Sequence, residues 1–428
     1  MTLLLLTIGG SHQPIVTALR EARPDFAVFF CTDLDPATGR AGSRVQIEGK
    51  GLCIKAKPND DKPTLPNIPS QANLTEGSYE VAIVPADDLD GAHSVMRRTL
   101  ADARRRYPAA RLLADYTGGT KTMTAALVLA ALQDDDVELQ LVAGSRADLV
   151  RVAEGTQASV PAAVEGVRLR RAMRAHLTAW QRHAYGEAAA GLRRLPQPRD
   201  AGLRATLARA RDISAAFAAW DDFDHAGAAS VLLDTYVAVA AEPLRDHVPA
   251  LRLLAGEAST KRTGLQLWDL WLNAQRRAVA GRYDDAVGRA YRLIEWTAQW
   301  LLETHAQLRT ADLPGAIAEK AGIAPGRDGR YQAGLHAAWM LVAAHVGGAP
   351  AAFIGAQQSA LLDHLQRRNR SILAHGFAPI DAADWRAFQV WLETAFIPML
   401  QGSLQQAGVR SVFPQLPDIY PWDRDNAC

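Results

Sequence analysis

Residues 111–132 read Arg111-Leu-Leu-Ala-Asp115-Tyr-Thr-Gly-Gly-Thr-Lys121-Thr-Met123-Thr-Ala-Ala-Leu-Val-Leu-Ala-Ala-Leu132, and this stretch decides the fold of the first part of the chain. Its first five residues have the short apolar pattern of a buried strand, and its last ten have the composition of a buried helix. The turn between them combines two glycines, several hydroxyls and Lys121. Such a turn presents backbone N–H groups and the positive end of a helix dipole, so it favours a phosphate ligand.

This turn differs from the standard nucleotide-binding loops. Lys121 follows Thr120 and not a glycine, and no glycine stands at the upstream position that a triphosphate loop requires. The dinucleotide pattern Gly-x-Gly-x-x-Gly is also absent from the turn. A tight strand–helix connection without any ligand is the alternative interpretation.

The first 155 residues alternate short apolar segments with helical ones. This alternation predicts an α/β domain with a parallel sheet that is covered by helices on both faces. The expected strands are 3–8, 26–31, 79–84, 112–115 and 138–142, and the expected helices between them are 14–20 and 93–107. Residues 33–71 are rich in Gly, Pro, Lys and Asp, and we expect a long loop or hairpin inserted into the sheet domain.

A second loop follows the first expected strand. It reads Gly9-Gly10-Ser11-His12-Gln13, and Pro14 suits the first turn of the next helix. Ligands of open α/β sheets bind beyond the carboxyl ends of the strands, so we expect both loops to line one pocket at the same sheet edge. His12 is a candidate for ligand contact or catalysis, and a capping or packing role is the alternative.

The length, net charge and cysteine content of the chain exclude several classes of protein. The 428 residues suffice for two or three domains, and the net charge of +1 creates no general attraction to nucleic acid or membranes, so a polyanion site must be local. Three cysteines (Cys31, Cys53 and Cys428) show neither metal-site spacing nor a disulfide framework. No apolar run is long enough to span a membrane, and the first residues lack a basic leader. We therefore expect a soluble cytoplasmic protein.

After about residue 160 the sequence is rich in Ala, Leu, Arg and Trp and carries few strand signals, so we expect an all-α region. The expected helices cover residues 167–194, 203–219, 227–241, 264–280, 283–305, 334–346, 356–375 and 383–401.

A second motif closes the 356–375 segment. It reads Arg367-Arg-Asn-Arg-Ser-Ile-Leu-Ala-His375, and Gly376 is a natural helix C-cap. Arginine and histidine together can cleave RNA without a metal: histidine transfers protons near neutral pH, arginine holds the phosphate, and the 2′-hydroxyl attacks to leave a 2′,3′-cyclic phosphate. The spacing alone is not diagnostic, because His176 and His336 also follow arginines at similar distances and a basic helix surface explains each case.

These motifs, in this order, resemble those of the CARF–HEPN proteins, the ancillary ribonucleases of type III CRISPR immunity. Residues 115–123 look like the conserved loop of the CARF sensor domain, and residues 7–14 look like the loop after its first strand. Residues 368–376 look like the HEPN motif, an arginine and a histidine separated by four to six residues. The resemblance spans nearly the whole chain and is weakest in the middle helices.

The resemblance implies an organisation for the chain. A Rossmann-like CARF domain would cover residues 1–155 and an all-α HEPN ribonuclease domain residues 281–428, with 156–280 as a helical connector or the first part of HEPN. It also implies a homodimer, in which two CARF domains share one two-fold symmetric ligand and two HEPN motifs form one active site. The implied partners are cyclic tetra- or hexa-adenylate as activator and single-stranded RNA as substrate, with no metal, other cofactor, membrane or stable DNA partner.

The resemblance also assigns the site residues. The implied ligand contacts are Gly9, Gly10, Ser11, His12, Thr117, Gly118, Gly119, Thr120, Lys121 and Thr122. The implied ribonuclease residues are Asn369, His375 and either Arg368 or Arg370. Helix geometry and the following Asn369 favour Arg368, because residues seven apart share a helix face, whereas the shorter spacing favours Arg370.

The implied function is an endoribonuclease that the cyclic oligoadenylate activates in antiviral defence. Some CARF pockets also cleave their own activator slowly, and Thr117, Lys121 and His12 are the candidate groups for such an activity here. Two alternatives stay open. One is a ligand-responsive regulator whose helical part binds DNA, although no helix-turn-helix with a basic recognition helix is evident. The other is a scaffold whose helical part only binds partners.

Overall fold

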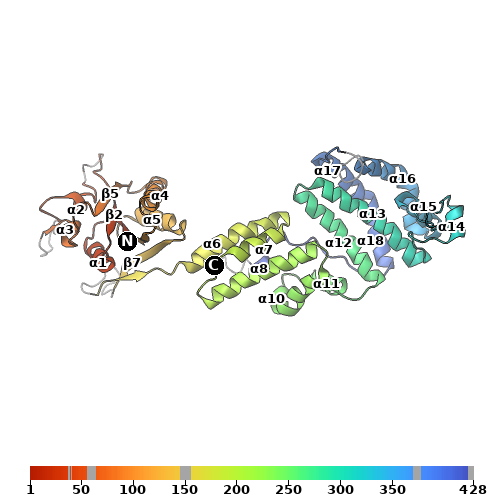
Figure 1. Ribbon diagram of the computed structural model, residues 1–428, viewed down its shortest axis with the longest axis horizontal. Coiled ribbons are helices and arrows are strands. Elements are labelled where there is room, and N and C mark those ends of the chain that lie inside the picture. The colour runs from red at the N-terminus through yellow and green to blue at the C-terminus, as the bar shows by residue number, and fades with distance from the viewer. Residues whose placement is uncertain (37–38, 40, 55–63, 145–155, 370–376, 423–428) are drawn as a thin grey trace. The chain divides into compact units, whose positions relative to one another are not determined.

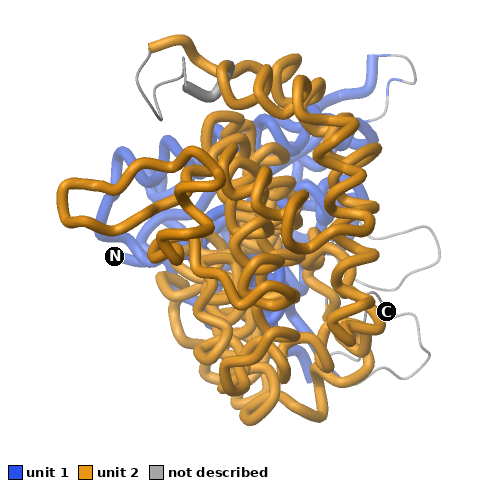
Figure 2. Tube along the Cα trace, turned by 90° about the vertical axis from the view of Figure 1, so that its right-hand side faces the viewer, with its two compact units in different colours: residues 1–170 blue, residues 171–428 orange. Residues whose placement is uncertain are grey.

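The computed structural model describes residues 1–36, 39, 41–54, 64–144, 156–369 and 377–422, and at 367–369 it describes the backbone alone. The chain divides into two compact units, residues 1–170 and 171–428, which Figure 2 distinguishes by colour. Each unit is described by itself.

Unit 1 is built on a six-stranded sheet with the strand order β5-β2-β1-β6-β7-β8. The first five strands in this order run parallel, and β8 pairs antiparallel with β7. The strands are β1 (Thr2–Thr7), β2 (Phe26–Cys31), β5 (Tyr79–Ile83), β6 (Arg111–Asp115), β7 (Val137–Ala143) and β8 (Ala158–Pro161). The five strands predicted from apolar runs are confirmed, and the antiparallel edge strand β8 is an addition to the prediction.

Helices cover both faces of this sheet (Figure 1). One face carries α1 (Gln13–Ala22), α2 (Val45–Glu48) and α3 (Ile68–Gln71), and the other carries α4 (Leu89–Arg106) and α5 (Lys121–Leu132). The predicted insertion contains α2, α3 and a small antiparallel pair, β3 (Leu52–Ile54) and β4 (Leu65–Pro66). The α/β class predicted for this part of the chain is confirmed.

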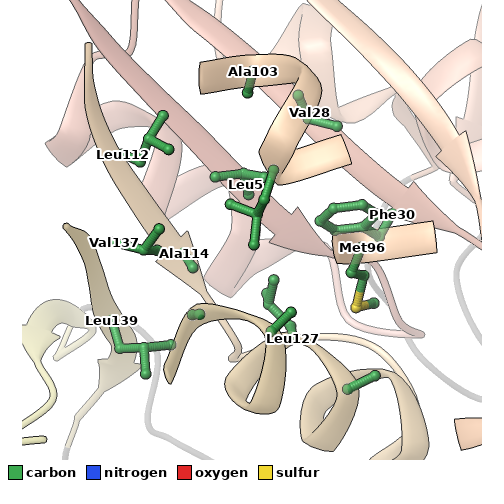
Figure 3. Packing of buried hydrophobic residues seen from close by; sticks show 14 of the residues in the cluster. Leu5, Val28, Phe30, Met96, Ala103, Leu112, Ala114, Leu127, Val137 and Leu139 are labelled. Carbon is green, nitrogen blue, oxygen red and sulfur yellow. The ribbon is translucent and has the colours of Figure 1, made fainter. Parts of the chain in front are cut away.

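The central strand β1 explains why its sequence is apolar without alternation. Leu3 and Leu5 pack toward α4 and α5, whereas Leu4 and Leu6 pack toward α1. All four side chains are fully buried, because helices cover both faces of the parallel sheet. Figure 3 shows the first of these layers, where Leu5, Phe30, Met96 and Leu127 meet.

Unit 2 is helical in the part that the structure describes, which confirms the predicted class. Its elements, counted from the helix that crosses the unit boundary, are α6 (Glu165–Leu177), η1 (Thr178–Arg182), α7 (Tyr185–Arg194), α8 (Ala201–Asp221), α9 (His225–Ala229), η2 (Ser230–Thr235), α10 (Val237–Ala240), α11 (Val248–Ala255), α12 (Thr260–Val279), α13 (Tyr283–Ala306), α14 (Gly315–Lys320), α15 (Leu335–His345), α16 (Gly348–Asn369), α17 (Ala382–Trp391), η3 (Leu392–Phe396) and α18 (Ile397–Gln406). Trp180, Trp220 and Trp339 are fully buried in its core. No helix among the described residues is long and apolar enough to cross a membrane.

Two predicted helices of unit 2 are interrupted by π-helical turns. The 227–241 segment is broken at Ser230–Thr235, where the Thr235 hydroxyl donates to the carbonyl oxygen of Ser230 five positions earlier. The 383–401 segment widens at Leu392–Phe396, and Pro398 follows two residues after the end of this turn. Proline has no N–H to donate and its ring crowds the carbonyl four residues earlier, so a wider turn relieves the conflict.

An extended C-terminal segment (residues 409–422) lies against the helices of unit 2. Side chains of the helical part hold its backbone: Trp268 Nε1 donates to the carbonyl oxygen of Phe413 over 2.8 Å, and the Tyr185 hydroxyl donates to that of Pro417 over 2.7 Å. Arg276, which is 1% exposed, donates from Nη1 to the Gln415 side chain over 2.7 Å. The same guanidinium pairs with Asp221 and Asp269 in the core.

Candidate functional site

The candidate ligand pocket lies where β1 and β6 end side by side in the centre of the sheet. The chain leaves β1 through α1 toward β2, and it leaves β6 through α5 toward β7, in the opposite direction and over the opposite face. This reversal is a topological switch point, the usual place for a ligand in an open α/β sheet. The two loops singled out from the sequence, 9–12 and 117–122, are therefore neighbours at this point.

Glycines permit the close approach of these two loops. A Cβ atom added at Gly9 would lie 2.6 Å from the backbone nitrogen of Gly119, and one added at Gly118 would lie 2.3 Å from the carbonyl oxygen of Thr7. Gly119 itself has a backbone φ of +90°, which residues other than glycine rarely adopt. The glycines thus hold the turn after β6 directly against the end of β1.

Hydroxyl groups fix the turn after β6. The Thr7 and Thr124 hydroxyls both donate to the carbonyl oxygen of Gly118, over 2.6 and 3.0 Å. Thr120 is the N-cap of α5, because its hydroxyl accepts from the N–H of Met123 over 3.1 Å, and the same hydroxyl donates to the carbonyl oxygen of Ala86 over 2.5 Å. Thr120 therefore shapes the turn, a role that the family resemblance did not indicate.

Asp115, the last residue of β6, also fixes this turn through hydrogen bonds. Its carboxylate accepts from the backbone N–H of Thr117 over 3.0 Å and from the Gln140 side chain over 3.1 Å. The side chain is fully buried, and burial raises the pKa of Asp115 while the hydrogen bonds from Thr117 and Gln140 lower it. Thr117 in turn accepts from the N–H of Val142 over 2.7 Å. The sequence feature that marks this residue is a carboxylate directly after the buried apolar run Leu112–Ala114.

The solvent side of the pocket presents groups suited to an anion. Lys121 is the first residue of α5 and is exposed, and no ion-pair partner for it exists among the described residues. His12 is the N-cap of α1 and is partly exposed, next to the exposed Ser11. Gln46 of α2 donates to the carbonyl oxygen of Gly9 over 2.6 Å and so holds the first loop. Two helix N-termini and one lysine thus point to a phosphate-bearing ligand.

The second motif lies only partly within the described residues. Arg368 and Asn369 belong to the last turn of α16, whereas Arg370 and His375 lie outside the described residues. The two competing Arg–His pairs have other partners: His336 is hydrogen-bonded to Gln358 at 3.0 Å, and the ring of His176 packs against Gly191 of α7.

The fold and the candidate site define a class of protein: an α/β domain with two glycine loops at its central switch point, followed by a helical region. Residues 255–397 of that region match the family model of the Csm6 HEPN domain. The chain is also similar to the solved structure of Enterococcus italicus Csm6 bound to cyclic hexa-2′-fluoro-hexa-dAMP. That likeness has a TM-score of 0.53 and 12% identity, and it covers 96% of this chain and 95% of that chain.

The family model covers part of the chain and shows that the helical region is similar to the Csm6 HEPN domain. At 12% identity the structural likeness concerns the fold. No curated protein sequence matches the chain.

Proposed function

We propose that this protein is a single-strand-specific endoribonuclease that a cyclic oligoadenylate activates, acting in type III CRISPR antiviral defence. The observation that carries the proposal is the pairing of the two glycine loops at the β1–β6 switch point on a chain whose helical region matches the Csm6 HEPN domain. The first feature suits a phosphate-rich regulator, and the second belongs to a ribonuclease family.

The proposed sensor is the pocket formed by residues 9–12 and 117–122. A single copy offers one lysine and two helix N-termini, which is little for a ring with several phosphates. Two copies related by a two-fold axis would double these groups around one symmetric ring. A cyclic tetra- or hexa-adenylate that binds one arrangement of the dimer more tightly would shift the population toward it.

The proposed ribonuclease site consists of Asn369, His375 and either Arg368 or Arg370, again doubled across a homodimer. One imidazole takes the proton of the ribose 2′-hydroxyl while that oxygen attacks the adjacent phosphorus. The bond from phosphorus to the 5′-oxygen breaks, and the second imidazole protonates the leaving oxygen. Arginine stabilises the charge on the phosphorane, and the products are a 2′,3′-cyclic phosphate and a 5′-hydroxyl end.

The domain limits stay part of this proposal. We assign residues 1–155 to the sensor and 281–428 to the ribonuclease domain, with 156–280 as a connector or the first part of HEPN. The family model begins at residue 255, in the last residue of α11, and the division into compact units falls after residue 170.

The test is cleavage of a labelled single-stranded RNA in the presence of a chelator, with and without cyclic tetra- or hexa-adenylate. We expect the activator to raise the rate and His375→Ala to abolish the raised rate. The matched control is His336→Ala, which removes the histidine of a competing Arg–His pair and should leave the rate unchanged. An activator-independent rate would contradict the sensor role, and full activity of His375→Ala would contradict the site assignment.

The same assay separates the other candidate functions. A scaffold or a DNA-binding regulator would bind the cyclic oligoadenylate, measured as a thermal shift, without cleaving RNA. Slow cleavage of the activator in the sensor pocket is tested with the Arg368/Arg370/His375 triple alanine variant. Chromatography should then show linear products from the cyclic ring, and an intact ring would discard this activity.

A further inference from the structure

A cavity of about 430 Å³ opens in unit 2, and most of its lining belongs to residues 255–397, which match the HEPN family model. Its walls come from the end of α12, the start of α13, helix α17, the residue that ends η1, and the C-terminal segment. The side chains that matter here are His183, Gln275, Tyr283, Trp385, Arg386 and Gln389. The volume falls within the range of small-molecule sites, which are about 300–1,000 Å³.

The cavity combines flat aromatic surfaces with side-chain amides. Trp385 is 4% exposed and lines the wall together with Tyr283. Gln389 and Gln275 each direct one amide N–H toward the carboxylate of Glu393, over 2.9 and 3.4 Å. That bond fixes each amide and leaves a carbonyl oxygen and a second N–H for a ligand.

His183 adds a neutral hydrogen-bond acceptor. Its Nδ1 lies 2.8 Å from the Tyr185 hydroxyl, and that hydroxyl donates its only proton to the carbonyl oxygen of Pro417. Nδ1 must therefore carry the proton of the imidazole, and Nε2 is left as the acceptor. Burial, reinforced by the charge of Arg276, lowers the pKa of His183 to about 4, so the ring stays neutral at physiological pH.

Arg386 supplies a positive charge at the rim. It is exposed on α17, and among the described residues it has no hydrogen-bond or ion-pair partner. A guanidinium that has no partner among the described residues, at the rim of a cavity whose other lining side chains are uncharged, is suited to a phosphate whose attached group enters that cavity.

The chain itself limits the distance to the proposed cleavage site. Ala382 begins α17, lines the cavity and follows His375 by seven positions. A fully extended chain spans at most about 3.6 Å per residue, so seven residues of chain can span at most about 25 Å. A single-stranded RNA bound at the cleavage site therefore reaches this cavity within a few nucleotides.

We propose that this cavity binds one unpaired base of the RNA substrate, with Trp385 and Tyr283 against its ring, the amides of Gln389 and Gln275 at its edge, and Arg386 on a neighbouring phosphate. The proposal rests on the proposed ribonuclease function and adds a base-selective subsite to it. Recognition of single-stranded RNA combines these same elements, namely aromatic surfaces, fixed hydrogen-bonding edges and phosphate contacts.

The experiment compares four RNA substrates that differ at one nucleotide near the cleavage site. We measure kcat/KM for each with saturating activator. Gln389→Ala should reduce the ratio between the best and the worst base about 5-fold or more, because a good hydrogen-bonded base contact discriminates by about 1–3 kcal/mol. Arg386→Ala should lower kcat/KM about equally for all four bases. The matched controls are Gln405→Ala and Arg252→Ala, two exposed residues away from the cavity that should change neither quantity.

A binding measurement keeps the two proposals apart. The same four RNAs, made with 2′-O-methyl ribose so that they cannot be cleaved, are titrated into the parent protein and the variants. If the parent does not cleave RNA but Gln389→Ala and Tyr283→Ala still lose base-selective binding, the subsite stands and the ribonuclease proposal fails. If both folded variants keep the parent's base ratios in cleavage and in binding, the subsite is overturned.

Discussion

The packing of the two glycine loops makes a sharp prediction about Gly9→Ala. The new methyl group would lie 2.6 Å from the backbone nitrogen of Gly119 and 3.1 Å from its Cα. The obstacle is backbone and cannot rotate aside as a flexible side chain can, so the turn after β6 must move. Overpacking of this kind costs about 1–3 kcal/mol. A unit of this size should then lose about 2–4 °C of Tm for each kcal/mol.

Gly10→Ala is the matched control, one residue further along. A methyl group at Gly10 would meet no atom within 4 Å, and the backbone there does not lie in the left-handed region. Its effect should lie between zero and a gain of about 1 kcal/mol, since alanine restricts the unfolded chain.

The assay is thermal unfolding of both variants, first alone and then with cyclic hexa-adenylate. Without ligand, only Gly9→Ala should lower Tm. With ligand, the displaced turn should weaken binding about 10-fold, because restoring it costs more than about 1.4 kcal/mol. Equal Tm values for the two ligand-free variants would refute the close approach of the loops. If Gly9→Ala is destabilised but binds cyclic hexa-adenylate with the parent's affinity, the two loops do not form the ligand site.

Three further predictions concern stability. Arg276→Met removes a buried cation that two carboxylates share, so it should cost about 3–5 kcal/mol in urea unfolding although Asp221 keeps Arg277 and Asp269 keeps His225, whereas the exposed Arg252→Met should cost under about 0.5 kcal/mol. Acid should destabilise unit 2: the folded pKa of His183 is about 4 against the usual 6.5, so between these values only the unfolded chain takes up the proton, and stability falls by about 3 kcal/mol as pH falls. His183→Asn, which tolerates the φ of 55°, should flatten that part of the pH profile. Thr120→Ala should cost about 0.5–2 kcal/mol by loss of the α5 cap, and Thr120→Ser should retain most of it.

The fold of unit 1 was predictable where burial on both faces dictates the sequence. β1 and β2 are continuous apolar runs because helices cover both of their sides. β8 was not predictable in the same way, since Ala158–Pro161 is short and largely exposed and becomes a strand only by pairing with β7. The π-helical turns depend on single residues such as Pro398, and the periodicity of apolar residues along a helix does not reveal them.

The candidate site was also predictable only in part. That the two loops meet could be predicted, because parallel strands end at one edge and a topology rule places the ligand there. What fixes them could not, because Gln46 reaches Gly9 from 37 residues away and Gln140 reaches Asp115 from 25. The cavity near His183 is a stronger case. Its tautomer depends on a bond between residues 185 and 417, which are 232 positions apart and share no sequence pattern.

The C-terminal segment has a consequence for biosynthesis. Unit 1 can pack its sheet once about 170 residues have been made, whereas Trp268, Tyr185 and Arg276 find their partners only when residues 413–417 emerge. At translation rates of about 5–20 residues per second, residues 413–417 are made roughly 10–50 s after Tyr185 and roughly 7–30 s after Trp268 and Arg276. During that interval the Arg276 guanidinium, the Trp268 indole and the Tyr185 hydroxyl lack the contacts that residues 413–417 provide. The helical unit therefore completes these buried contacts only after residues 413–417 have been made.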